Sequence, residues 1–209
     1  MRSRDDLTAL RSALQSELPG ARAKEKLAPQ PSGGRLYAPI PHDARSAAVL
    51  IALVPDGDAL WAPFIERVHV AGDVHSGQIA LPGGSCEVGE QVLETALRET
   101  HEEIGLPPDT MQALGDLTPQ WIPVSGYVVH PVVALADRRR DLVPDAVEVQ
   151  AAFWLDLQRL RAQAPQWREM ERGGRRFRSP GWSIDEGFLW GATAMMLAEF
   201  FEVLDSAGL

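Results

Sequence analysis

The stretch LPGGSCEVGEQVLETALRETHEEIGL, residues 81–106, constrains the fold more than any other part of this 209-residue chain. Its second half has the apolar spacing of an amphipathic helix over roughly residues 90–104. Gly105 stops that helix, and Pro107-Pro108 makes its restart difficult. In front of it, Pro82-Gly83-Gly84 permits a close approach of backbone to other groups. The fold must therefore contain a helix that ends at Gly105 and a tight glycine turn shortly before its N-terminus.

Three glutamates crowd one side of this helix. At about 100° per residue, Glu99, Glu102 and Glu103 share an arc of about 100°, and Leu93, Leu97, Thr100 and Ile104 form an adjoining core stripe. Like charges three or four residues apart cost roughly 0.2–0.5 kcal/mol per pair, and negative charge near a helix C-terminus opposes the helix dipole. A solvated acidic surface helix would survive both costs. Alternatively, the three carboxylates and an exposed carbonyl beside them hold a hard divalent cation such as Mg²⁺.

Composition and charge narrow the class of protein. The net charge of −9 and the pI near 5.0 argue against a sequence-independent grip on nucleic acid. A single cysteine, Cys86, cannot form an internal disulfide and is typical of a reducing compartment. The charged N-terminus does not have the apolar segment of a signal peptide, and no run of about 18 apolar residues predicts a membrane span. We therefore expect a cytoplasmic protein with neither nucleic acid nor membrane as a partner.

The remaining patterns predict one α+β domain, because strands outnumber helices and do not alternate regularly with them. An amphipathic helix is expected at the N-terminus, with a leucine stripe formed by Leu7, Leu10, Leu14 and Leu18. Residues 21–44 are typical of a loop or tether. We expect strands at 46–54, 60–67, 113–123, 127–136 and 147–155, a short helix at 156–163, a hairpin around Gly173-Gly174 and a final helix at 189–204. Residues 1–44 are then a helix and tether packed on a domain of residues 45–209. The leucine stripe and the final helix could form a homodimer face, or each could pack on its own domain.

The glutamate helix also resembles a known motif. The Nudix box, G-x5-E-x7-R-E-U-x-E-E-x-G-U, is matched by Gly84, Glu90, Arg98-Glu99, Thr100, Glu102-Glu103, Ile104, Gly105 and Leu106. Only Thr100 departs from the usual bulky aliphatic residue. The resemblance implies the Nudix fold, a mixed β-sheet between α-helices with a loop–helix–loop motif. It also implies Mg²⁺- or Mn²⁺-dependent hydrolysis of a nucleoside diphosphate linked to another moiety.

The same resemblance implies roles for individual residues. Metal would be bound by Glu99, Glu102, Glu103 and the carbonyl of Gly84. Glu90 and Arg98 would form the ion pair that braces the loop, or Arg98 could instead offset the local acidity. Glu102 or Glu103 would act as general base. Glu148, in a family-like Glu-Val pair outside the box, is another candidate for the base.

The flanking segments are similar to the coenzyme A pyrophosphatase branch of this family over about residues 45–204. They are AAVLIALV, VSGYVVHPVVAL, EVQAAFWLDL and FLWGATAMMLAEF. Ahead of the box, FIERVHVAGDVHSGQIALPGG keeps Arg67, His75 and Gln78, and the resemblance implies that these three bind substrate. Alternatively, His75 is a plain loop histidine and Gln78 makes a hydrogen bond at a strand edge. The branch pattern has Leu-Arg where this chain has Gly72-Asp73, and an aromatic residue where it has Leu81.

The branch implies that coenzyme A, or a derivative of it, is cleaved to 3′,5′-ADP and 4′-phosphopantetheine. Because Gly72-Asp73 removes an arginine that could bind phosphate bidentately, hydrolysis of ADP-ribose, NADH or another nucleotide conjugate is an alternative. A non-catalytic nucleotide-sensing module is a third reading, although the retained carboxylates favour catalysis. Phe188 and Trp190 are more typical of core anchors than of a base-stacking platform. The basic cluster Arg175, Arg176 and Arg178 is either a solvated hairpin tip or a site for a 3′-phosphate.

Overall fold

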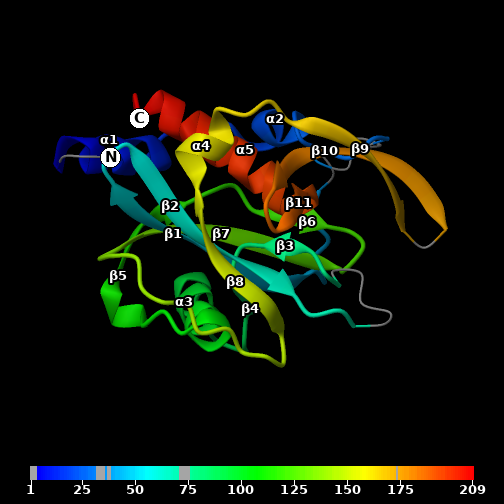
Figure 1. Ribbon diagram of the computed structural model, residues 1–209, viewed down its shortest axis with the longest axis horizontal. Coiled ribbons are helices and arrows are strands. Elements are labelled where there is room, and N and C mark those ends of the chain that lie inside the picture. Colours follow the sequence, from blue (N-terminus) through cyan, green and yellow to red (C-terminus); the bar gives the residue numbers. More distant parts are fainter. Residues whose placement is uncertain (1–3, 32–35, 37–38, 71–75, 173) are drawn as a thin grey trace.

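A computed structural model of the protein describes residues 4–31, 36, 39–70, 76–172 and 174–209. The α+β class predicted from the sequence is confirmed, because a mixed sheet lies between helices on its two faces (Figure 1). The helices are α1 (Arg4–Gln15), α2 (Gly20–Glu25), α3 (Val92–Ile104), α4 (Leu157–Arg161) and α5 (Gly191–Ser206), with a 3₁₀ turn at Pro108–Thr110. The strands are β1 (Arg45–Asp56), β2 (Ala59–Arg67), β3 (Ile79–Ala80), β4 (Gly83–Ser85), β5 (Met111–Asp116), β6 (Gln120–Ile122), β7 (Tyr127–Ala136), β8 (Val149–Asp156), β9 (Gln166–Arg172), β10 (Arg175–Ile184) and β11 (Gly187–Trp190).

The large sheet has the strand order β3-β2-β1-β7-β5, with β8 paired to β2, β4 paired to β1 and β6 paired to β7. Its centre is the parallel pair of β1 and β7, in which Arg45 lies opposite Tyr127 and Leu53 lies opposite Leu135. The other strand pairs of this sheet are antiparallel. A parallel pair needs a long crossover connection, and here that connection contains β2, β3, β4, α3, β5 and β6.

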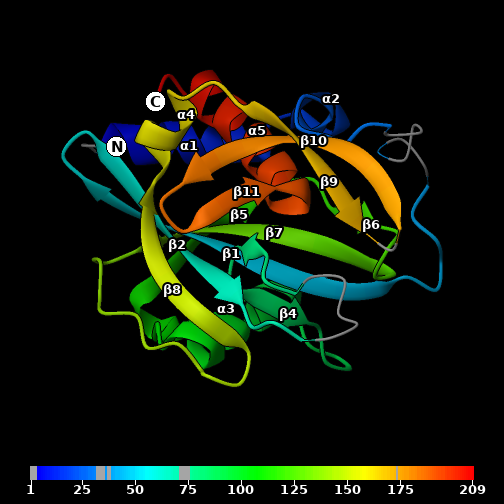
Figure 2. The ribbon, with the colours of Figure 1, turned by 45° about the vertical axis from the view of Figure 1, so that its right-hand side comes forward.

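Strand β1 is apolar on both faces because both faces of the sheet are covered. Ala48, Leu50 and Ala52 belong to the core cluster that includes Ala96 of α3. The alternate residues Ile51 and Leu53 belong to the larger cluster that includes much of α5. Figure 2 shows α3 on one side of this sheet, and α5 with the small β9–β11 sheet on the other. A continuous apolar run such as β1 is what a strand buried on both faces requires.

The N-terminal segment packs on the second face of the sheet. The leucine stripe joins the same core cluster as Phe200 and Leu204 of α5, so it packs on its own domain and is not available for a dimer face. Residues 21–44, expected to be a loop or tether, instead begin with helical structure, because α2 covers residues 20–25. A helix this short is unstable alone. It is held by buried Lys24, whose Nζ lies 3.2 Å from the Oε2 of Glu199 in α5.

The small sheet has the order β11-β10-β9 and contains the predicted hairpin. Arg172 lies opposite Arg175 across its turn; Gly173 itself lies outside the described residues. Gln30 of the N-terminal segment forms an isolated bridge with Arg178 of β10. The final helix begins at Gly191 rather than at residue 189, because residues 187–190 pair with β10. Within the described part of the chain, no helix is long and apolar enough to span a membrane.

Candidate active site

Helix α3 has defined ends and one buried side. The Gln91 amide donates to Glu94 Oε2 at 2.9 Å at its start, and Gly105 ends it with a left-handed φ of 74°. Thr100, the unusual residue in the box, is fully buried and donates its hydroxyl to the Ala96 carbonyl at 2.6 Å. A threonine is therefore accepted because its one polar group is satisfied. Leu93, expected in the core stripe, is instead 36% exposed.

Arg98 lies at the centre of the acidic side. It binds Glu90 bidentately, with Nε to Oε1 at 2.8 Å and Nη2 to Oε2 at 3.0 Å. Its Nη1 donates to Glu99 Oε1 and to Glu102 Oε2, each at 2.9 Å, and its Nη2 donates to the Ser85 carbonyl at 3.2 Å. One guanidinium thus contacts three carboxylates, offsets part of their charge and ties the helix to β4.

The ion pair of Glu90 and Arg98 is strongly held in its charged form. Hydrogen bonds from Arg98, from the Glu87 amide and from the Thr95 hydroxyl lower the pKa of Glu90 to about 2. The hydrogen bond to Glu90 in turn raises the pKa of Arg98. This pair therefore braces the loop between β4 and α3 over the whole physiological pH range.

Glu103 lies apart from this network, in a buried position. It is only 2% exposed, so the surface-helix reading is wrong for this carboxylate. Its Oε2 accepts from the Gly83 amide at 2.8 Å, and its Oε1 lies 3.6 Å from Arg67 Nη1 without a hydrogen-bond partner among the described residues. Burial raises the pKa of Glu103 to about 7, and the nearby charges of Glu99 and Glu148 add to this effect.

The glycine turn brings backbone against the carboxylates. A Cβ on Gly84 would lie 2.3 Å from Glu99 Oε2, so any larger residue here would displace the Glu99 carboxylate. Gly83 has a φ of +147°, and a Cβ there would lie 2.2 Å from the Ala48 carbonyl oxygen. Burial raises the pKa of Glu99, whose carboxylate is packed against this turn.

The donor set of this cluster fits a hard divalent cation. Among the described residues, no three histidine, cysteine or acidic side chains are arranged so that they could hold a metal ion; Glu99 and Glu102 contact Arg98 instead. The available donors are nevertheless all oxygens, which Mg²⁺ and Mn²⁺ prefer, and buried Glu103 Oε1 has no hydrogen bond to give up. Arg98 contacts Oε1 of Glu99 and Oε2 of Glu102, so the second oxygen of each carboxylate is not used in these contacts.

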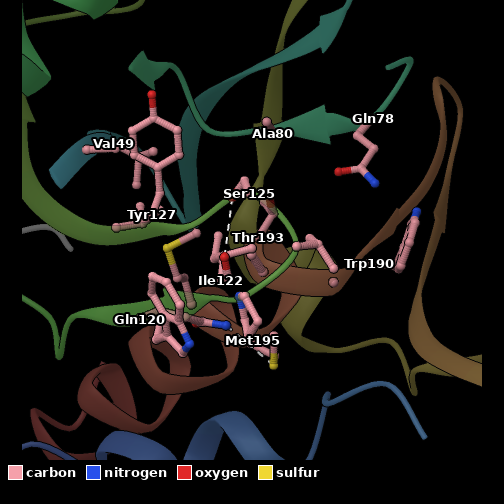
Figure 3. A pocket seen from close by; sticks show the side chains of 18 of the residues that line it. Val49, Gln78, Ala80, Gln120, Ile122, Ser125, Tyr127, Trp190, Thr193 and Met195 are labelled. Carbon is pink, nitrogen blue, oxygen red and sulfur yellow. Dashed lines mark hydrogen bonds between the residues drawn. The ribbon is translucent and has the colours of Figure 1, made fainter. Parts of the chain in front are cut away.

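A cavity of about 950 Å³ adjoins the acidic cluster. One end is lined by Arg67, Gln78 and the three residues of β4. The rest is largely apolar and is formed by β6, β7, the start of α5 and parts of the N-terminal segment (Figure 3). Arg67 and β4 lie at the boundary, because they line the cavity and also contact Glu99 or Glu103.

The other residues singled out from the sequence fall in several places. Gln78 lines the cavity, whereas His75 lies outside the described residues, as do Gly72 and Asp73. Arg176 also lines it, with its Nε 3.4 Å from Glu171 Oε2.

The two aromatic residues expected to anchor the core behave differently. Trp190 lines the cavity beside Phe177, with ring centroids 5.7 Å apart, so its expected place as a core anchor is wrong. Phe188 lies under the guanidinium of Arg168 instead, 4.3 Å from it.

Sequence reasoning missed most of the cavity wall. Its residues come from segments far apart in the chain; they include Ala28, Leu36, Gln120, Ile122, Met195 and Met196. The only sequence signal was the glutamine that opens the QWI segment of β6, a polar residue in a strand with a buried side. Tertiary packing, rather than local spacing, assembles this part of the site.

Comparison with known proteins agrees with this geometry. The NUDIX domain family matches residues 44–176. The Nudix hydrolase NudL of Pectobacterium atrosepticum is 33% identical over 160 residues, covering 75% of this chain and 81% of that protein. NudL of Yersinia enterocolitica is 32% identical over 172 residues, covering 80% and 84%. Both relatives are described as uncharacterized.

A solved structure shows the same fold. The MutT/nudix family protein of Enterococcus faecalis matches with a TM-score of 0.51 and 19% identity, covering 88% of this chain and 73% of that one. The Nudix fold expected from the sequence is therefore confirmed.

Proposed function

The chain belongs to the NUDIX family of pyrophosphohydrolases, and we propose that it cleaves the pyrophosphate bond of coenzyme A or its derivatives to 3′,5′-ADP and 4′-phosphopantetheine. The cofactor would be Mg²⁺ or Mn²⁺, and the protein would act in the cytoplasm. The observation that carries the proposal is the cavity, which begins at Arg67 and β4 beside the acidic cluster and continues over largely apolar walls.

The two ends of the cavity suit the two unlike parts of coenzyme A. The pyrophosphate needs a cationic partner, and Arg67 supplies one at the end of the cavity beside β4. The pantetheine arm is long and uncharged, and side chains such as Ile122, Met195 and Met196 offer it an apolar surface. The second ribose of ADP-ribose or NADH has several hydroxyls, which an apolar wall would leave without partners.

The residues of the acidic cluster and its neighbours would have different roles in the reaction. Glu99, Glu102, Glu103 and the Gly84 carbonyl would hold the cation, which supplies positive charge to activate water and to offset charge on the leaving phosphate. Glu103 is a candidate proton acceptor, because its Oε1 has no hydrogen-bond partner among the described residues. Glu102 and Glu148 are the alternative acceptors. Arg67, between Glu103 and the cavity, would hold a phosphate oxygen, while Glu90 and Arg98 keep the loop in place.

Hydrolysis of ADP-ribose, NADH or another nucleotide conjugate is the second candidate, and one specific observation favours it. Gly72-Asp73 replaces the Leu-Arg of the coenzyme A branch, so one arginine expected to face phosphate is missing from the sequence. Arg176, which lines the cavity, is a candidate for supplying that charge from another segment.

A substrate panel tests the proposal. Purified protein with Mg²⁺ or Mn²⁺ is incubated with coenzyme A, ADP-ribose, NADH and diadenosine polyphosphates, and the products are separated by chromatography. We expect release of 3′,5′-ADP from coenzyme A, lost in Glu102→Gln and retained in Glu169→Gln, which changes an exposed carboxylate on β9. If only another conjugate is hydrolysed, that compound rather than coenzyme A is the substrate. Bound metal with no turnover of any compound would favour a sensing module.

A further inference from the structure

We propose that Gln120 binds an amide of the substrate's uncharged arm and so makes this enzyme selective for amide-bearing arms; this inference rests on the proposed function. Gln120 opens β6 and lies under α5, where it lines the apolar part of the cavity (Figure 3). It has no part in the acidic cluster. Its role would be to choose the substrate rather than to perform the reaction.

The primary amide of Gln120 is buried and incompletely hydrogen-bonded. The residue is 3% exposed, and its Oε1 has no hydrogen-bond partner in the described part of the chain. Among the described residues, its Nε2 hydrogen-bonds only to the weak acceptor Sδ of Met195, at 3.5 Å. Turning the amide over would exchange the two ends but would still leave a polar group facing sulfur. A buried amide in this state destabilises the ligand-free protein, and a ligand with complementary hydrogen-bonding groups would remove that cost.

The position of Gln120 matches the far end of a substrate held at β4. Ser85 lies opposite Ala47, Ala47 lies opposite Val129, and Val129 lies opposite Gln120. These four residues form one row across β4, β1, β7 and β6, and directly opposite residues face the same side of a sheet. Three strand spacings of about 4.8 Å place Gln120 about 14 Å from the catalytic loop. A chain that starts at the phosphates therefore reaches Gln120 only if it is long and extended.

The chemistry around Gln120 favours an amide over a sugar. Met195, Met196 and Val129 surround this part of the cavity and cannot hydrogen-bond the several hydroxyls of a ribose. The arm of coenzyme A has amide groups separated by apolar carbon chains. Each amide has one N–H donor and one carbonyl acceptor, which are the complements of the Oε1 and Nε2 of Gln120. One amide of the arm can thus satisfy both ends of this side chain.

The first test separates a binding role from a structural one. In Gln120→Met the amide is replaced by an apolar side chain of similar length that can pack on Met195. Because an unsatisfied buried amide is removed, we expect the ligand-free variant to have a Tm a few degrees above wild type. A lower Tm would mean that Gln120 stabilises the fold, and would overturn the proposal. Gln112→Met, at an exposed glutamine of β5, is the matched control and should leave Tm unchanged.

The second test measures selectivity. With coenzyme A, we expect KM of Gln120→Met to rise roughly tenfold with kcat within twofold, because a binding interaction remote from the reacting phosphates is lost. Any turnover of ADP-ribose, which has no amide arm, should have the same KM in wild type and variant. An unchanged KM for coenzyme A, or an equal rise for both substrates, would overturn the proposal.

Calorimetry with pantetheine alone distinguishes failure of this inference from failure of the proposed function. If wild type does not cleave coenzyme A but binds pantetheine at least tenfold more tightly than Gln120→Met does, the amide site stands and only the proposed reaction fails. If coenzyme A is cleaved and pantetheine binds both proteins equally, the reaction stands and the role of Gln120 is wrong. If wild type does not bind pantetheine at all, the amide site is likewise wrong.

Discussion

Glu103 combines two features that oppose each other, because its side chain is buried and yet carries an ionisable carboxylate. It is a buried carboxylate with one oxygen bound to the Gly83 amide and the other without a hydrogen bond among the described residues. Arg67 is near enough to attract it, at 3.6 Å, but is too far away for a hydrogen bond. Such a group is unfavourable to the fold when it is charged, and it becomes favourable only when a cation or a proton is supplied.

In metal-free protein, the free energy of unfolding should depend on pH because of Glu103. The pKa of Glu103 is about 7 in the folded state against a reference value of 4.5, so the folded state binds more protons between these values. Stability should therefore fall as pH rises from about 4.5 to about 7, by on the order of 3 kcal/mol from this residue. Urea unfolding of wild type and Glu103→Gln with EDTA, at pH 5 and pH 7.5, measures the difference. A difference between the two proteins that does not vary with pH would contradict the assignment.

For single residues, the sequence predicted which charged side chains form one group better than it predicted which of them are buried. The box spacing identified Glu90, Arg98 and the three glutamates as one group, and Arg98 does contact Glu90, Glu99 and Glu102. Helical angles alone placed Glu103 on the same acidic face. They could not show that β2 and β4 cover this residue, because burial depends on strands that come from elsewhere in the chain.

Among the elements, β4 and α3 act as a unit, because glycine lets one backbone approach the carboxylates of the other. In Gly84→Ala the new Cβ would press on Glu99, so we expect kcat/KM to fall roughly 10- to 100-fold. The loss of Tm should be small, because φ at Gly84 is not in the left-handed region and the contact is with a side-chain end.

Gly89→Ala, in the loop between β4 and α3, should show the reverse pattern. Its φ is +85° and a Cβ there would meet nothing within 4 Å. We expect a loss of about 1–2 kcal/mol in stability with activity retained. Activity and thermal unfolding measured on both variants check this contrast; parallel losses in the two would contradict it.

The junction of α2 and α5 depends on a buried ion pair. Lys24 and Glu199 are both almost fully buried, and Glu199 Oε1 also accepts from the Gly20 and Thr118 amides at 3.1 and 3.2 Å. Burial lowers the pKa of Lys24, while Glu199 favours its charged form. Lys24→Met leaves a buried charge unpaired, so we expect a loss of about 3–5 kcal/mol in the free energy of unfolding.

Lys26→Met is the matched control for this junction. Its ion pair with Glu202, at 2.8 Å, is exposed on the lysine side, so its removal should cost less than about 1 kcal/mol. Denaturant unfolding of the two variants gives the comparison. Equal losses would mean that burial does not set the strength of the contact.

Elements with a strong local signal were predicted well, and those that depend on tertiary contacts were not. The apolar run of β1 and the bounded α3 have clear patterns in the sequence. The α2 helix does not, because its six residues are stabilised by Lys24 and Glu199 rather than by helix propensity. Likewise residues 189–190, the second half of β11, were predicted as the start of the final helix, because only their pairing with β10 makes them part of a strand.

For the molecule as a whole, a bound cation should stabilise the fold, because it would neutralise carboxylates whose charge Arg98 and Arg67 offset only in part. At a metal concentration about a hundredfold above Kd, the gain is about 2.7 kcal/mol. For a chain of this size that corresponds to a rise in Tm of roughly 5–10 °C. Thermal unfolding with Mn²⁺ should show this rise, and EDTA should reverse it. A rise of the same size in Glu102→Gln would mean that the metal binds elsewhere.

The parallel pairing of β1 with β7 also determines when this site can come into being. Every residue of the acidic loop and helix lies in the chain segment that this pairing closes. Closing so long a segment is entropically unfavourable and slow, and the core on both faces of β1 forms only with it. During synthesis on the ribosome, the carboxylates therefore emerge well before the strand that fixes them. Until β7 has left the ribosome, the nascent chain contains the whole motif in its sequence but cannot yet form the folded site.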